Sequence, residues 1–180
     1  MSKWKRGEAV VERLLALGSL DTISRSASDG SAILDQARRR LKVAQAALAI
    51  DQDGAYTNAY DAARLAATAL LIQQGLRPTT AGGHKAVEEA LLAQFGSGFA
   101  KFSVLRRRRH ELDYPDSSYS EASNNEASDA LDTAQLFVDT AAKILPELDF
   151  FSDTDEPSLV GNVHGAKNAA TEKKVRIRTR

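Results

Sequence analysis

The sequence predicts an all-α protein, an antiparallel bundle of four to five helices. Along several segments, apolar residues recur at spacings of three and four, the period of a helix with one buried face. Alanine is abundant and aromatic residues make up only 6% of the chain, as expected where helices pack closely. No segment shows the alternating pattern of a half-buried strand, so we predict no strands.

Residues 1–30 are predicted to form an extra N-terminal helix and a linker ahead of the bundle. The amphipathic segment 8–18 ends at Gly18, and residues 19–30 are rich in Ser and Asp. This linker closes on Asp29-Gly30-Ser31, which suits a helix N-cap. The first bundle helix is then predicted at about 32–50, with one buried stripe formed by Leu34, Ala37, Leu41, Ala44 and Leu48.

The middle of the chain predicts three further helices. The segment 55–76 is apolar over more than half of its circumference, so we expect it to be the central helix. A short helix is predicted at about 84–95, and Gly96-Ser97-Gly98 separates it from another at about 99–113.

The last helix is predicted to open near Ser120-Glu121 and to end before Pro146. Its buried seam alternates steps of four and three, as in coiled coils, through Ala127, Leu131, Ala134, Val138, Ala141 and Leu145. We therefore place the bundle at 31–148. Residues 149–180 are predicted to be a flexible, disordered C-terminal tail, and its basic end could alternatively be an arm that binds phosphate.

Composition narrows the classes of function. The formal net charge is zero, which argues against a protein that is drawn to nucleic acid by its overall charge. The chain has no cysteine, which argues against a disulfide framework and a thiolate zinc site. No apolar run is long enough for a membrane span, and Glu12 and Arg13 interrupt the one apolar stretch near the N-terminus. We expect a cytoplasmic protein without metal or cofactor and without membrane contact.

The run from Arg106 to Pro115 is the strongest functional signal. At 100° per residue, Arg106, Arg109, His110 and Asp113 fall on one helix face, with Tyr114 at its edge. Such a face could hold a phosphate and move a proton. It could equally be a helix surface with Arg–Asp ion pairs and no chemical role.

Other polar residues have simpler interpretations. His84 follows Gly82-Gly83 and is predicted to help cap the helix at 84–95. Tyr56 and Tyr60, one helical turn apart, are predicted to pack in the core or at a dimer interface.

Several strings, in order, resemble the HEPN superfamily, the helical-bundle proteins of prokaryotic toxin–antitoxin and defence systems. They are AYTNAYDAARLAATALLIQQGLRP, GGHKAVEEALLAQFG and LRRRRHELDYPD, followed by the long Ala-rich helix. The resemblance covers roughly residues 31–147 and implies a HEPN-like bundle. In active members an Arg, a polar residue and a downstream His form the motif, and two copies meet across a dimer interface to cleave RNA without a metal ion.

Carried onto this chain, that motif assigns the Arg position to Arg109 and the polar position to His110. Tyr114 stands where the family has its His, a departure that puts ribonuclease activity in question because a phenol is a weak base at neutral pH. A subgroup with an Arg-x-x-Arg-x-x-x-Asp-Tyr motif is more similar and aligns with Arg106, Arg109, Asp113 and Tyr114.

The resemblance implies Arg109, His110 and Tyr114 as catalytic residues, Arg106 and Arg109 as phosphate ligands, and Asp113 as an orienting residue. We predict a toxin-like, metal-independent endoribonuclease or RNA-binding protein that forms a homodimer and pairs with an antitoxin. The alternative is a catalytically inactive module that binds a nucleotide, RNA or a partner such as a nucleotidyltransferase, for which Tyr114 would be the modified residue. A purely structural helical scaffold is the third hypothesis.

Overall fold

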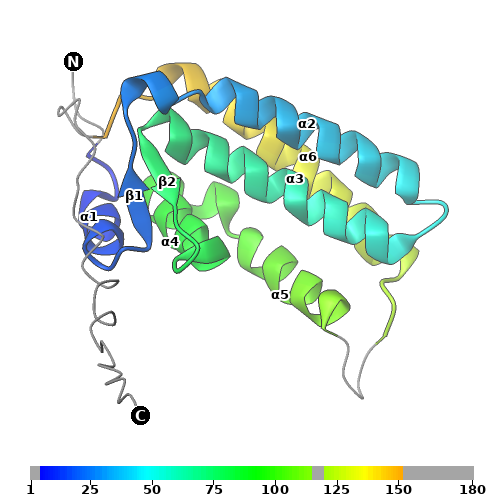
Figure 1. Cartoon of the computed structure of the whole chain (residues 1–180). Coiled ribbons are helices and arrows are strands. Elements are labelled where there is room, and N and C mark those ends of the chain that lie inside the picture. The colour runs from blue at the N-terminus through cyan, green and yellow to red at the C-terminus, as the bar shows by residue number, and fades with distance from the viewer. Residues whose placement is uncertain (1–4, 115–119, 152–180) are drawn as a thin grey trace, which may run out of the picture.

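Four helices form an antiparallel bundle (Figure 1). The computed structural model describes residues 5–114 and 120–151 of the chain. Within this part the bundle helices are α2 (Gly30–Ala47), α3 (Gln52–Gln73), α5 (Phe102–Asp113) and α6 (Asn124–Ile144). The predicted all-α fold class is confirmed. The predicted tail lies outside the described residues, apart from its first three positions.

Two hydrogen bonds fix the direction of α6 relative to α3. At one end of the bundle, the amide of Ala122 donates to the carboxylate of Asp53 at 2.6 Å, next to the first turn of each helix. At the other end, the amide of Phe151 donates to the carbonyl of Gln74 at 2.8 Å. The helices α3 and α6 therefore run in the same direction, while α2 and α5 run in the opposite one (Figure 1).

The helix α3 is the centre of the bundle, as its composition predicted. Its small side chains are buried around most of the helix, and Ala59, Ala62, Ala63 and Ala66 are completely inaccessible to solvent. Alanine lets neighbouring helices approach closely while favouring the helical backbone. The predicted stripe of α2 packs against this surface, with Leu34, Ala37, Leu41 and Ala44 buried.

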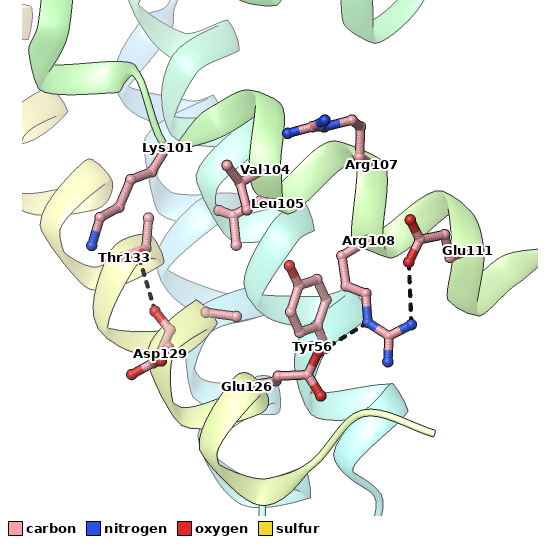
Figure 2. Close-up of a pocket in the computed structure, with 11 residues that line it drawn as sticks. Tyr56, Lys101, Val104, Leu105, Arg107, Arg108, Glu111, Glu126, Asp129 and Thr133 are labelled. Carbon is pink, nitrogen blue, oxygen red and sulfur yellow. Dashed lines mark hydrogen bonds and ion pairs between the residues drawn. The ribbon is translucent and has the colours of Figure 1, made fainter. Parts of the chain in front are cut away.

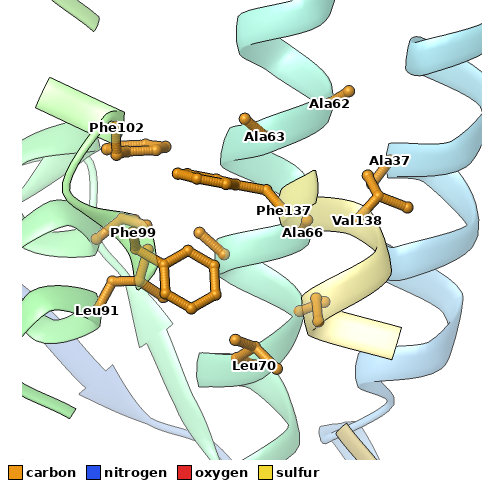
Figure 3. Close-up of a cluster of buried hydrophobic side chains, with 14 of the residues drawn as sticks. Ala37, Ala62, Ala63, Ala66, Leu70, Leu91, Phe99, Phe102, Phe137 and Val138 are labelled. Carbon is orange, nitrogen blue, oxygen red and sulfur yellow. The ribbon is translucent and has the colours of Figure 1, made fainter. Parts of the chain in front are cut away.

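Three phenylalanines fill the space between α3, α5 and α6 (Figure 3). The ring of Phe137 on α6 meets Phe99 edge-on at 4.8 Å between centroids and lies nearly parallel to Phe102 at 6.3 Å. All three rings are essentially buried. Because Phe102 begins α5, this cluster fixes the end of the helix from which the arginine run extends.

The remaining elements cover one end of the bundle. They are α1 (Glu8–Ala16), β1 (Leu20–Thr22), β2 (Leu76–Pro78) and α4 (Gly83–Phe95), together with the 3-10 turns Arg25–Ala27, Gly96–Phe99 and Leu145–Glu147. The prediction of no strands was wrong, since β1 and β2 pair antiparallel with Leu20 opposite Pro78. Strands of three residues are too short to show an alternating pattern in the sequence.

Gly82 allows the start of α4 to lie against the segment before β1. A Cβ atom at this position would come within 2.1 Å of the carbonyl oxygen of Ser19. Contacts this short are forbidden, so the backbones meet here only because residue 82 has no side chain. This close approach positions the first turn of α4.

The helix α6 begins at Asn124, shortly after the predicted opening near Ser120-Glu121, at a capping box. The hydroxyl of Ser123 accepts from the amide of Glu126 at 3.2 Å, and the carboxylate of Glu126 accepts from the amide of Ser123 at 2.8 Å. The Ser-Asn-Asn-Glu spacing is the usual sequence signature of this cap. These bonds also lower the pKa of Glu126.

We expect Ser123→Ala to lower the free energy of unfolding by about 1 kcal/mol, because the cap loses its side-chain acceptor. Ser120→Ala is the matched control, since Ser120 lies in the same segment, is exposed and makes no side-chain hydrogen bond to any residue that the structure describes. Urea titrations followed by circular dichroism would measure both. Equal stability of the two variants would contradict a stabilising role for the cap.

No helix in residues 5–114 and 120–151 is long and apolar enough to cross a membrane.

Candidate functional site

A solvent-filled depression of about 560 Å³ lies between the start of α4 and the arginine-bearing face of α5. We call it the α4–α5 pocket. Its walls include Gly82, Gly83 and His84 from α4 and its preceding turn, and Arg106, Arg109 and His110 from α5. Three of the five residues predicted from the sequence therefore line one pocket.

The two predicted phosphate ligands are each held by a carboxylate. The Nε atom of Arg106 lies 2.8 Å from Glu88 on α4, and Arg109 forms an ion pair with Asp113 one turn further along α5. The side chains of Arg109 and Asp113 are about one quarter exposed. Asp113 thus contacts the guanidinium that it was predicted to orient, while the partner of Arg106 was not predicted.

Arg109 also packs on the buried face of the site. Its guanidinium carbon lies 5.8 Å from the ring centroid of Tyr60, within the range of a cation–π contact. Its Nε atom is buried and finds no acceptor among the described residues. Arg109 is therefore held from two sides, by the Asp113 carboxylate and by the Tyr60 ring.

His110 and Tyr114 stand at the outer end of the pocket. Their rings are 4.8 Å apart, and both side chains are exposed. His110 contributes to the pocket wall, whereas Tyr114, with 68% of its surface exposed, does not. The structure thus brings Tyr114 to His110, outside the lining of the pocket.

His84 does not cap α4, contrary to the prediction. The N-cap residue Gly82 makes no side-chain cap hydrogen bond, and the Nδ1 atom of His84 instead lies 2.7 Å from the hydroxyl of Tyr60. Tyr60 is completely buried between this imidazole and the ring of Phe102. The core prediction for Tyr60 agrees with this burial, but its hydroxyl also connects α3 to the α4–α5 pocket.

Burial, more than the surrounding charges, shifts the pKa values of this pair. Burial, assisted by Arg64 and Arg109, lowers the pKa of His84, so its imidazole is neutral at pH 7. Burial raises the pKa of Tyr60 to about 12, so its hydroxyl stays protonated. The site therefore contains a neutral imidazole beside permanently charged guanidiniums.

The cationic side chains that line the pocket make it suitable for an anion. Lys85, Arg106, Arg107 and Arg109 line its walls with one carboxylate, Glu111, while Glu89, Glu88 and Asp113 pair with Lys85, Arg106 and Arg109 respectively. The partial positive charge of the α4 N-terminus adds to this field. Phosphate and carboxylate groups are the ligands that such an arrangement favours.

A second depression of about 500 Å³ lies between α3, α5 and α6 (Figure 2). Arg108 crosses it and forms ion pairs with Glu111 and Glu126. The Nη2 atom of its guanidinium also donates to the carbonyls of Ser120 and Glu121. Only 17% of this side chain is exposed. Arg108 therefore connects α5 to the start of α6, and its charge is neutralised.

Two features of the site could not be read from the sequence. Tyr60 and His84 are 24 positions apart on different helices, and no local spacing relates them. At 100° per residue, Arg107 falls outside the face shared by Arg106 and Arg109, yet it borders both depressions. A long, flexible side chain covers more of a helix surface than its Cβ direction suggests.

Comparison with known families identifies the bundle. Residues 31–145 match the family model of the HEPN domain. No curated protein and no solved structure matches the chain. The family match covers more than half of the 180 residues and includes α2 to α6 with the whole α4–α5 pocket. The chain belongs to the HEPN domain family.

Proposed function

We propose that the protein is a metal-independent endoribonuclease, with the α4–α5 pocket as the site that holds the scissile phosphate. Its HEPN domain supports a protein of the nuclease, RNA-binding or toxin–antitoxin type. The observation that carries the proposal is the presence of Arg106, Arg109 and His110 in one cationic pocket. A homodimer and an antitoxin partner belong to the same proposal and follow from the family resemblance.

The chemistry that this set of residues supports is attack of an RNA 2′-hydroxyl on the neighbouring phosphate. Arg106 and Arg109 would hold the non-bridging oxygens and stabilise the charge that develops there. His110 would take the 2′ proton as the 2′-oxygen–phosphorus bond forms. The bond from phosphorus to the 5′-oxygen then breaks, and this oxygen takes up a proton from water. The products are a cyclic phosphate and a 5′-hydroxyl.

Tyr114 has a positioning role in this proposal. Its ring lies against His110, and the two side chains stand one turn apart at the end of α5. A phenol is a weak base at neutral pH, so proton removal falls to the imidazole.

The test is incubation of the purified protein with a labelled RNA pool in EDTA. We expect fragments with cyclic or 3′-phosphate ends from the wild type and none from His110→Ala. Products with other ends, or equal cleavage by the variant, would contradict the assignment of the base.

A second function is favoured by the exposure of Tyr114. Its phenol is accessible at the end of α5, and the two predicted phosphate ligands, Arg106 and Arg109, already have carboxylate partners. A non-catalytic HEPN module, with Tyr114 as the target of a nucleotidyltransferase partner, is consistent with these observations. This alternative predicts binding of RNA without cleavage by the wild type.

A further inference from the structure

We infer that His84 is a phosphate-binding residue of the α4–α5 pocket, which donates from Nε2, and that Tyr60 positions it. This inference deepens the proposed function, because the ligand is the phosphate group of the RNA. It adds to the arginine run two residues from outside α5.

The first step is the direction of the hydrogen bond between Tyr60 and His84. The Tyr60 hydroxyl is buried, and Nδ1 of His84 is its one hydrogen-bond partner among the described residues. If Nδ1 carried the proton and donated to the hydroxyl oxygen, the phenolic hydrogen would be left without an acceptor. Buried donors are rarely left unpaired. Tyr60 therefore donates to Nδ1, and the proton of the neutral imidazole is on Nε2.

The second step is the state and surroundings of the imidazole. The charged groups that act on it are Asp61 and Arg64 of α3 and Arg106 and Arg109 of α5, a set in which cations predominate. Together with burial they disfavour the imidazolium, which agrees with a neutral ring that accepts from Tyr60.

The third step is the position of the free nitrogen. His84 lines the α4–α5 pocket, while its Nδ1 edge is turned to the buried Tyr60 hydroxyl. Nε2 makes no hydrogen bond to any described residue, so its N–H is available to a ligand. A neutral imidazole is a suitable donor to an anionic oxygen because its tautomer is fixed before the ligand binds.

The arrangement offers an anion donors from three residues. Arg106 and Arg109 supply charge, and His84 supplies a neutral N–H whose direction is set by the core. A phosphate on this surface would be held between α4 and α5.

The test combines nitrogen NMR of the full-length, labelled protein with a titration of inorganic phosphate at pH 7.5. The chain has three histidines, so His84→Gln assigns the signal of His84. We expect the proton on Nε2 in the wild type and a shift of this signal as phosphate is added. We expect His84→Phe to weaken phosphate binding by about tenfold, and His84→Gln, whose amide can donate from a similar position, to weaken it less.

Tyr60→Phe keeps the ring and removes only the hydroxyl, so it tests the positioning role in a folded protein. We expect His84 to lose its preference for the Nε2 proton and phosphate to bind more weakly. Tyr56→Phe is the matched control, because Tyr56 is also buried on α3, one turn earlier, and lines the other depression. It should change neither measurement.

A wild-type His84 with its proton on Nδ1, or equal phosphate affinity of the wild type and His84→Phe, would overturn the inference. RNA cleavage in EDTA, measured on the same samples, separates it from the proposed function. Cleavage with unaltered phosphate binding by His84→Phe means that the His84 inference is wrong and the ribonuclease stands. The expected phosphate response without any cleavage means that the inference stands and the ribonuclease is wrong.

Discussion

Under the proposed function, Arg109→Ala is expected to cleave RNA at least about 100-fold more slowly than the wild-type protein. The variant loses a guanidinium that lines the α4–α5 pocket, and with it a charged, planar donor for the phosphate oxygens. It also leaves the carboxylate of Asp113 without its partner, which places an unbalanced negative charge beside the ligand. The rate of product formation from a defined RNA in EDTA would measure the effect.

Two further variants show whether the loss is specific. Arg109→Lys keeps the charge but not the planar fork, so an intermediate rate is expected. Arg38→Ala removes an arginine that forms a comparable helical ion pair, at 2.7 Å from Asp35, on a part of α2 that does not line the pocket. Its cleavage rate should equal that of the wild type. Full activity of Arg109→Ala would mean that the arginine run is a helix surface without a catalytic role.

The helices could be predicted because each has a local cause in the sequence. The stripe from Leu34 to Leu48 and the seam from Ala127 to Leu145 repeat at helical spacing. They are buried as predicted, except for Leu48, which caps the end of α2 and is partly buried. The strands could not be predicted, because the pairing of Leu20 with Pro78 joins segments that are far apart in the chain. The formation of these two strands depends on tertiary contacts, and a local sequence pattern does not show such contacts.

The residues of the candidate site also fall into a group that the sequence predicts and a group that it does not. Arg106, Arg109, His110 and Asp113 share a face because the helical period alone places them there, and the structure brings the first three to one pocket. His84 enters the same pocket only because α4 folds back beside α5. The sequence placed it correctly at the start of a helix but could not show that its partner would be Tyr60.

Replacing Phe137 with alanine is expected to lower the free energy of unfolding by about 3–5 kcal/mol, more than Ser123→Ala. The side chain is 1% exposed and contacts the rings of Phe99 and Phe102, so its removal leaves a cavity among α3, α5 and α6 (Figure 3). Part of the loss is the aromatic contact itself, worth about 0.5–1.5 kcal/mol for each pair. Urea unfolding followed by circular dichroism would measure it.

Leu136→Ala provides the control, because Leu136 precedes Phe137 on α6 but is 56% exposed. Its free energy of unfolding should lie within about 0.5 kcal/mol of the wild-type value.

The Phe137→Ala variant also tests how the α4–α5 pocket is supported. Phe102 and Leu105 are the two buried residues of α5, and Phe102 contacts both Phe137 and Tyr60. A cavity at Phe137 therefore loosens the attachment of the helix that carries Arg106 and Arg109. Phe137→Ala should consequently lose RNA cleavage at temperatures where most of the protein is still folded. A loss of cleavage that only follows the folded fraction would show that α5 is held independently of this cluster.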